Sequence, residues 1–228
     1  KHFGLDAGFF AKKNKQVYAV NGVSFEIERG KTYGLVGESG CGKTTTARLL
    51  VRMYNADSGK IYFNPQEKTE PIEVANLDKK ALSAYREKVK YIFQDPSRSL
   101  NPRMTIASIL SSPLKYSSHW QGKEQAREKA TELLEEIGLD KADLDRRPQE
   151  FSGGQRQRIS IARGLILEPE LLICDEVVSA LDVSVQAQIL NLLQDLRKKR
   201  GLSFLFIAHD LKVSCYFCDT IGVMYRGM

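Results

Sequence analysis

The stretch Gly37-Glu38-Ser39-Gly40-Cys41-Gly42-Lys43-Thr44 decides the fold of this chain, because it matches the phosphate-binding loop pattern G-x-x-x-x-G-K-[ST]. Residues 31–36, just before it, predict a short buried strand, and residues 44–53 predict a helix with apolar positions at helical spacing. A strand, a glycine-rich loop and a helix in this order surround a polyphosphate with backbone N–H groups and point a helix N-terminus at it. We therefore interpret the stretch as a polyphosphate-binding loop rather than as an incidental glycine turn before Lys-Thr.

The residue types within this loop suit separate tasks. Gly37, Gly40 and Gly42 permit backbone angles and a close approach that a side chain would block. Lys43 is placed to reach the β- and γ-phosphates, and the Thr44 hydroxyl is placed to hold Mg²⁺. The other residues that we expect to contact the nucleotide from this stretch are Glu38, Ser39, Cys41 and Thr45.

Bulk composition is that of an ordinary globular protein with one substantial core and possibly a small subdomain. The chain has 228 residues, of which 42% are hydrophobic and 27% charged. No apolar run reaches the ~20 residues that span a bilayer, and no signal peptide opens the chain, so we expect a cytosolic protein with at most a peripheral membrane role. The net charge of +6 is scattered among acidic residues, which favours a solvated basic surface over nucleic-acid binding.

The four cysteines do not form a disulfide pattern. Cys41 lies in the phosphate-binding loop and Cys174 in an apolar strand, whereas Cys215 and Cys218 form a C-x-x-C pair without a second pair or a nearby histidine. The C-x-x-C pair falls in a predicted helix. We therefore expect two small apolar side chains packed at i, i+3 spacing rather than a metal or redox site.

Strands alternate with helices along the chain, which predicts a three-layer α/β fold. The predicted strands are 17–27, 31–36, 60–63, 89–93, 171–174 and 203–208, with a tail of a strand at residues 1–3 and a last strand just before residue 225. The predicted helices are 44–53, 79–88, 105–112, 122–137, 155–167 and one that Asp182 or Ser184 caps and that runs to about residue 200. Residues 5–16 and 97–104 are predicted loops. Residues 95–150 are a predicted helical insertion, within a single domain 1–228, between the two parts of a nucleotide-binding core, 1–94 and 151–228.

Polar residues follow three of the predicted strands. Asp175 and Glu176 end one strand, Gln94 ends another and His209 a third, and α/β folds place their sites at this end of their strands. Asp175 can orient the Mg²⁺ shell through water, and Glu176 can polarise an attacking water. Gln94 offers an amide oxygen to the same metal, and His209 lies within reach of a γ-phosphate. Each residue alone could merely cap a loop; the joint occurrence makes the set a candidate catalytic site.

Two further motifs bring out a family resemblance. With Phe151-Ser152-Gly153-Gly154-Gln155 and Ser179-Ala180-Leu181-Asp182, the chain resembles the ATP-binding cassette ATPases over essentially its full length. The first motif is similar to the family's signature sequence, usually Leu-Ser-Gly-Gly-Gln, and the second to its D-loop. Gln94 resembles the Q-loop glutamine, and His209 the switch histidine. The family's fold is a P-loop ATPase core with an antiparallel β subdomain and an inserted helical subdomain.

The resemblance implies a site that two chains share. Ser152, two glycines and the following helix N-terminus form a second anion-binding surface. In the family this surface closes on an ATP held by the opposite subunit, so that Ser152, Gly153, Gly154 and Gln155 count as nucleotide contacts. The implied cofactors are ATP and Mg²⁺. The second ATPase subunit is either another copy of the chain or a paired homologue.

Residues 93–105 and 179–188 resemble the oligopeptide and dipeptide importer branch of the family. This implies a motor at the cytoplasmic face of the membrane, bound to integral-membrane permease subunits and served indirectly by an extracytoplasmic solute-binding protein. Val177-Val178 stands where the family usually has Pro-Thr or Pro-Val, a change that spares every chemical group. The family's C-terminal portion, with its His-Pro-Tyr-Thr stretch, is absent from this sequence, so no cofactor is carried over from it.

Some assignments stay open. Phe3 best matches the aromatic residue that stacks on adenine in the family, and Tyr18 is its rival. A soluble cassette ATPase of DNA repair or translation is the alternative function, but such proteins carry coiled-coil insertions, zinc modules or tandem cassettes that this sequence lacks. A purely regulatory nucleotide-binding module would need neither Glu176 nor His209. The transported solute is not readable from an ATPase sequence.

Overall fold

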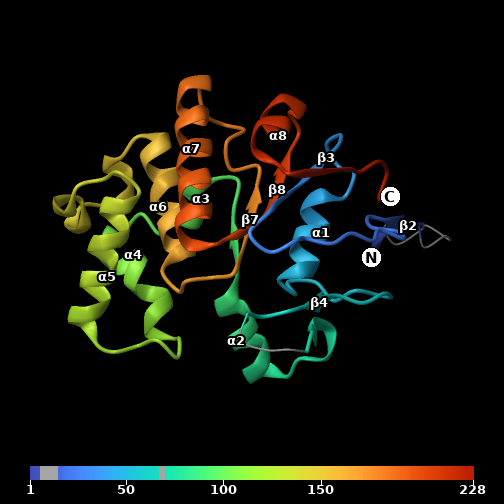
Figure 1. The fold of residues 1–228 in the computed structure, drawn as a ribbon, viewed down its shortest axis with the longest axis horizontal. Helices are drawn as coiled ribbons and strands as arrows, with labels where there is room; N and C mark the ends of the chain where they lie inside the picture. Colours follow the sequence, from blue (N-terminus) through green and yellow to red (C-terminus); the bar gives the residue numbers. More distant parts are fainter. Residues whose placement is uncertain (6–14, 67–69) are drawn as a thin grey trace.

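A computed structural model describes residues 1–5, 15–66 and 70–228, and the centre of the structure is a five-stranded sheet (Figure 1). Across the sheet, the strands are β6 (Val89–Ile92), β7 (Leu171–Asp175), β8 (Ser203–Ala208), β3 (Thr32–Val36) and β9 (Thr220–Val223). Every neighbouring pair is parallel. The four predicted strands that correspond to β3, β6, β7 and β8 are confirmed. The predicted loop 5–16 falls mainly on residues 6–14, which lie outside the described residues.

Helices cover both faces of this sheet. On one face, α1 (Lys43–Leu50) and α2 (Lys79–Lys88) contribute Ala47 and Tyr85 to a cluster that contains Ile173 and Leu205 of the strands. On the other face, α6 (Gly153–Leu165), α7 (Val183–Arg200) and α8 (Leu211–Phe217) pack against strand residues that include Phe204 and Phe206. Successive strand residues point to opposite faces, so β8 serves both clusters. The predicted three-layer α/β fold is confirmed.

The helical insertion lies at one end of the molecule, on the left of Figure 1. It contains α3 (Pro96–Ser99), α4 (Ile106–Lys115) and α5 (Lys123–Glu136), followed by short 3-10 turns at Lys141–Asp145 and Pro148–Glu150. The prediction of a continuous loop over 97–104 is wrong at its start. There, the Asp95 side chain accepts a hydrogen bond from the Ser97 N–H at 2.9 Å and begins the single turn of α3.

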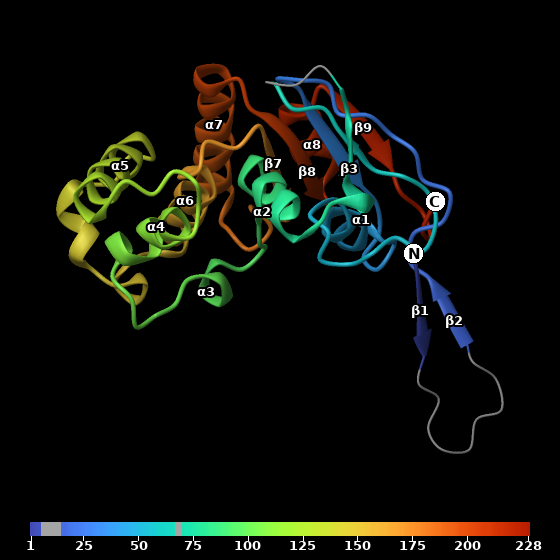
Figure 2. The same ribbon diagram turned by 90° about the horizontal axis from the view of Figure 1, so that it is seen from below.

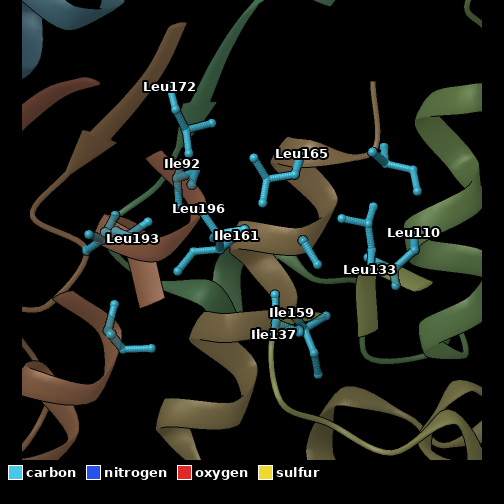
Figure 3. Packing of buried hydrophobic residues seen from close by; sticks show 14 of the residues in the cluster. Ile92, Leu110, Leu133, Ile137, Ile159, Ile161, Leu165, Leu172, Leu193 and Leu196 are labelled. Carbon is cyan, nitrogen blue, oxygen red and sulfur yellow. The ribbon is translucent and has the colours of Figure 1, made fainter. Parts of the chain in front are cut away.

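The larger hydrophobic core runs without a break from the sheet into this insertion. Figure 3 shows Ile159, Ile161 and Leu165 of α6 between strand residues such as Leu172 and helix residues such as Leu133. All five side chains are fully or almost fully buried. The helix α6 therefore packs with α4 and α5 as well as with the sheet. The division into a core (1–94 and 151–228) and a helical subdomain (95–150) accordingly stays a proposal about motion, because the two parts share one core.

The antiparallel part of the structure consists of two separate pairs. The strands β1 (His2–Leu5) and β2 (Lys15–Tyr18) form a hairpin that projects from the rest of the molecule in Figure 2, and β4 (Tyr62–Phe63) pairs with β5 (Ile72–Glu73). The 3-10 turn Val74–Asn76 follows β5. The predicted strand 17–27 is wrong beyond Tyr18. Its alternating apolar residues instead pack irregular backbone against the sheet; they are Val23, Phe25 and Ile27.

The C-x-x-C cysteines do not behave as a packed pair. Cys215 lies in α8 and is exposed, and Cys218 follows the last residue of that helix. The Cys218 sulfur occupies the space beside Gly34 of β3, where an added Cβ would lie 2.7 Å from it. The prediction of i, i+3 packing is therefore wrong for Cys215, because the helix ends before Cys218 and the two side chains meet different surroundings.

Glu136 joins the end of α5 to the end of α7, and we predict that this ion pair gives the protein an acid-sensitive part of its stability. Glu136 pairs with Arg200 and, at 3.0 Å, with Lys199. Burial raises the pKa of the Glu136 carboxyl, but the two cations outweigh it, and the net pKa is lowered. The stabilisation is therefore present above the unfolded pKa of about 4.3 and is lost as pH falls through the lower folded value.

Glu136→Gln should lower the free energy of unfolding at pH 7 by about 1 kcal/mol, since the basic partners are partly exposed. In denaturant titrations, the difference from wild type should shrink as the pH is lowered from 7 to 3. The matched control is Glu135→Gln, which neutralises the exposed neighbouring carboxyl. A Glu136→Gln deficit that stays constant across this range would contradict the assignment.

Candidate functional site

The phosphate-binding loop connects β3 to α1 and depends on glycine at two positions. Gly37 and Gly42 have φ angles of 152° and 111°, which side chains rarely adopt. A Cβ added at Gly42 would lie 2.1 Å from the Ala19 carbonyl oxygen, and one at Gly37 would lie 2.1 Å from the Met224 carbonyl oxygen. The loop is thus pressed between two other backbone segments, and this contact fixes its shape.

Lys43 is the first residue of α1 and is almost completely buried. Its ammonium group donates hydrogen bonds to the carbonyl oxygens of Gly37 at 2.7 Å and Glu38 at 2.8 Å. The side chain therefore curls back over its own loop. This keeps a positive charge next to the backbone that is predicted to surround a phosphate.

Asp175 ties the loop to the end of β7. The Thr44 hydroxyl donates to Asp175 Oδ1 at 3.1 Å, and the Tyr91 hydroxyl of β6 donates to Asp175 Oδ2. Asp175 is only 6% exposed, so these two bonds satisfy a carboxylate that water scarcely reaches. As a donor, the Thr44 hydroxyl keeps its oxygen lone pairs available for a metal ion.

Tyr91 was not among the residues expected at the site. Burial raises the pKa of its hydroxyl well above the usual range, and the neighbouring Asp175 charge raises it further. The group therefore stays protonated and acts as a donor. No sequence pattern pointed to it, because its contact with Asp175 joins residues 84 positions apart. Its ring lies 4.8 Å from that of Phe93.

Three of the predicted catalytic residues are brought together. The Gln94 amide donates to Glu176 Oε2 at 2.8 Å, and Glu176 and His209 line the same small pocket of about 40 Å³. Ser179, the first residue of the predicted D-loop, donates from its hydroxyl to the Glu176 carbonyl oxygen at 2.9 Å. Ser179 also lines the pocket and was not predicted as a site residue.

Glu176 has a backbone conformation that points to a local constraint. Its φ angle is 50°, in the left-handed region that is uncommon for a side-chain-bearing residue. Its N–H donates to the Ile207 carbonyl oxygen of β8 at 3.0 Å, so the chain must turn directly after Asp175. Such conformations cost roughly 1–3 kcal/mol and cluster at functional sites. The turn lets consecutive carboxylates act differently: Asp175 stays buried, and Glu176 reaches the pocket.

The signature residues begin α6. Ser152 caps this helix: its hydroxyl accepts from the Gln155 N–H at 3.3 Å, and its own N–H donates to Gln155 Oε1 at 2.9 Å. Gly154 packs against α7, where an added Cβ would lie 2.6 Å from Val185. Within the described part of the chain, no protein acceptor takes the N–H groups of Gly153 and Gly154. A capped helix start with free N–H groups is suited to bind an anion.

The structure does not bring these signature residues to Lys43. They start α6, on the opposite face of the sheet from α1, and the two helices lie apart in both Figure 1 and Figure 2. One chain thus holds two separate candidate anion-binding surfaces.

The two candidate adenine-stacking residues lie on the β1–β2 hairpin. Phe3 is half-buried, and its ring meets that of Tyr54 edge-on with the centroids 5.4 Å apart. Tyr18 is 59% exposed and lies beside His2, with 5.9 Å between ring centroids. In the β1–β2 register, Phe3 pairs with Val17 and Tyr18 with His2, so the two candidates lie on opposite faces of the hairpin.

Comparisons with known proteins show which sequences and structures this chain resembles. A sequence model of the ABC transporter family matches residues 20–179. The oligopeptide transport ATP-binding protein OppF of Bacillus subtilis (strain 168) is 48% identical over 218 residues, which cover 96% of this chain and 70% of that protein. The dipeptide transport ATP-binding protein DppF of Escherichia coli (strain K12) is 47% identical over 227 residues, which cover 100% of this chain and 66% of that protein.

A solved structure supports the fold. It is the dimeric post-hydrolysis state of the ATP-binding cassette MJ0796 bound to ADP and Pi, with a TM-score of 0.81 and 27% identity. The match covers 96% of this chain and 91% of that chain.

Proposed function

This chain belongs to the ABC transporter family, and we propose that it is the ATP-hydrolysing motor subunit of an importer for oligopeptides, dipeptides or similar solutes. The names of its relatives support the solute class, because both OppF and DppF are described as peptide transport ATP-binding proteins. The chain spans 70% and 66% of the length of these two proteins, so the solute class belongs to the proposal. Neither of these two proteins is named for DNA repair or translation, and that alternative is not favoured.

The observation that carries the proposal is the junction of Thr44, Asp175 and Glu176. The Thr44–Asp175 hydrogen bond of 3.1 Å joins the phosphate-binding loop to the strand end where Glu176 turns toward Gln94. Hydroxyl, carboxylate and amide oxygens are the ligands that Mg²⁺ prefers. The loop offers a backbone shaped by glycine at positions 37 and 42, together with the Lys43 charge, for the phosphates. These residues fit a nucleotide with Mg²⁺.

Each residue then has a separate task. Bound Mg²⁺–ATP would supply the γ-phosphoryl group and neutralise part of its charge. Thr44 and Gln94 would hold the metal directly, and Asp175 through water. Glu176 would orient and polarise the attacking water, and His209, at the edge of the same pocket, would contact the γ-phosphate. The stacking aromatic residue is Phe3, with Tyr18 as its rival.

We predict that Glu176→Gln and Lys43→Ala separate turnover from binding. Glu176→Gln should keep ATP affinity but lower kcat by ~10²-fold or more, because water-orienting groups contribute on that scale. Lys43→Ala should instead weaken ATP binding, because it removes the buried cation of the loop. Steady-state ATPase assays and equilibrium binding of a fluorescent ATP analogue measure the two effects. A Glu176→Gln protein with near wild-type turnover would refute the catalytic assignment.

The separation of the two anion-binding surfaces supports a shared site. We infer that Ser152, Gly153, Gly154 and Gln155 of one ATPase subunit contact the nucleotide held by Lys43 of another. In a head-to-tail pair with twofold symmetry, this contact occurs twice. The solved cassette with the same fold is dimeric. The partner is either a second copy of this chain or a paired homologue.

Addition of ATP should convert Glu176→Gln protein from monomer to dimer, because the nucleotide supplies the negative charge between two positive surfaces. Ser152→Arg should block both this shift and turnover, since its side chain would fill the space in front of the helix start. Binding of ATP to the single chain should stay intact. Sedimentation velocity with and without ATP is the measurement. Full ATPase activity from a strictly monomeric species would exclude the shared site.

The proposed location is the cytoplasmic face of the membrane, with integral-membrane permease subunits as partners and a solute-binding protein acting indirectly. No helix in the described ranges is long and apolar enough to cross a bilayer. Contact with the permeases is assigned to residues 97–113. Gln94 leads directly into this segment, and Arg163 of α6 donates to the Ser99 carbonyl oxygen within it. Nucleotide-dependent changes at Gln94 could therefore reach both the segment and the signature helix.

Crosslinks to the permease should come from this segment. Arg98, whose side chain is 90% exposed, is a suitable position for a cysteine. In a Cys215→Ser background, which removes an exposed natural thiol, Arg98→Cys should crosslink to the permease in the assembled transporter. Glu128→Cys, at an exposed position on α5, is the matched control and should not. Crosslinks that map only to residues 5–16 would contradict this docking site.

A further inference from the structure

Tyr91 lies beside the proposed metal site, but it has no role in the reaction proposed above. It is the third residue of β6, three positions before Gln94, and its hydroxyl donates to Asp175 Oδ2. The bond links strands that are neighbours in the sheet, since Tyr91 pairs with Ile173 in the β6–β7 register. Tyr91 therefore reaches the proposed metal site from the side opposite to Thr44.

Two protein groups donate hydrogen bonds to the Asp175 carboxylate, and the Tyr91 hydroxyl is one of them. A buried carboxylate that lacks partners costs several kcal/mol, so its oxygens are normally all occupied. Oδ1 accepts from Thr44 and Oδ2 from Tyr91, and no basic side chain in the described ranges forms an ion pair with Asp175. An ionised carboxylate accepts about four hydrogen bonds. Each oxygen thus keeps one acceptor position for metal-bound water.

Arg48 places a positive charge near the Tyr91 hydroxyl. It lies one helical turn after Thr44 on α1, and its guanidinium donates to the Tyr54 hydroxyl at 3.2 Å. Its charge acts to lower the pKa of the nearby Tyr91 hydroxyl, although burial raises that pKa more. Arg48 has no carboxylate partner within the described ranges. A nearby cation makes the Tyr91 hydroxyl a stronger donor to Asp175.

We propose that Tyr91 is a positioning residue that holds the Asp175 carboxylate in the orientation needed for water-mediated Mg²⁺ binding, with the charge of Arg48 strengthening the Tyr91 hydroxyl as a donor. The proposal rests on the assignment of Thr44 and Asp175 to the metal site. Loss of the hydroxyl would leave Oδ2 without a protein partner, and Asp175 would rotate away from Thr44 or draw in a disordered water. Mg²⁺ affinity would fall, while phosphate contacts from the loop backbone and Lys43 would remain.

A purely structural role for Tyr91 makes a different prediction. Its ring packs beside Phe93 and against the cluster on the α1 face of the sheet. Tyr91→Phe keeps the ring, so packing alone predicts no change in metal affinity. Tyr85→Phe is the matched control. The Tyr85 hydroxyl is also a partly buried donor, but it bonds the Leu50 carbonyl oxygen at 2.6 Å, away from Asp175.

The test measures binding rather than turnover. In a Glu176→Gln background, the fluorescence of N-methylanthraniloyl-ATP is titrated with Mg²⁺ and, separately, the analogue is titrated in EDTA. Tyr91→Phe should raise the half-saturating Mg²⁺ concentration roughly tenfold, since groups that orient metal-linked residues contribute 10–100-fold to metal affinity. Affinity in EDTA should stay within twofold of the parent. Tyr85→Phe should leave both values within twofold.

The outcomes separate this inference from the proposed function. A parent protein that binds no nucleotide, with or without Mg²⁺, would contradict the function itself. A parent with normal Mg²⁺ dependence beside a Tyr91→Phe protein within twofold of it would overturn the role of Tyr91 alone. If thermal melting shows that Tyr91→Phe is unfolded, Arg48→Gln decides. Because it weakens the Tyr91 donor without removing it, Arg48→Gln should raise the half-saturating Mg²⁺ concentration by less than the roughly tenfold expected of Tyr91→Phe, and an unchanged value would overturn the proposal.

Discussion

The hydrogen bond between Thr44 and Asp175 joins residues 131 positions apart, and the candidate site depends on it. It spans the end of β8, because the strand order is β7-β8-β3. The strands β6, β7, β8 and β3 are neighbours in the sheet, so the segments that follow them start from four adjacent strand ends. These segments contain Gln94, Glu176, His209 and Gly37, respectively. Parallel strands bring all four to one edge, where the phosphate-binding loop, the Asp175 carboxylate and the pocket can meet.

Because they share one core, the signature residues should move together with the helical insertion rather than with the phosphate-binding loop. Side chains of α6 belong to the cluster that includes α4, α5 and α7, whereas α1 belongs to the cluster on the other face. Close-packed interiors transmit displacement instead of absorbing it. A movement of α4 and α5 would therefore carry Ser152 with it. The same movement would reach Lys43 only through the sheet or through Gln94.

Most of the fold was predictable from local sequence patterns. The hydrophobic repeats of strands and helices span only a few residues, and the phosphate-binding loop requires a strand before it and a helix after it. Residues 17–27 show the limit: their alternation reflects burial of Phe25 and its neighbours on irregular backbone, which no local rule distinguishes from a strand. At the site, motif residues could be named in advance from strand ends. Tyr91 and Arg48 could not, because their roles arise from contacts between segments that only the three-dimensional structure brings together. Ser179 belongs to the predicted D-loop, but its hydrogen bond to the Glu176 carbonyl oxygen is visible only in the structure.

Each chain holds both candidate anion-binding surfaces, and this restricts how two chains would share the proposed site. A twofold axis that sets Lys43 of one chain against Ser152 of the other must do the same for the reciprocal pair, so a symmetric dimer forms two equivalent sites or none. If the partner is a paired homologue instead of a second copy, the two sites need no longer be equivalent, but both would still form. This chain would still contribute one complete loop with Asp175 and Glu176 to the first site and one signature helix start to the second. Its own residues would therefore supply a complete half to each proposed site, whichever partner it takes.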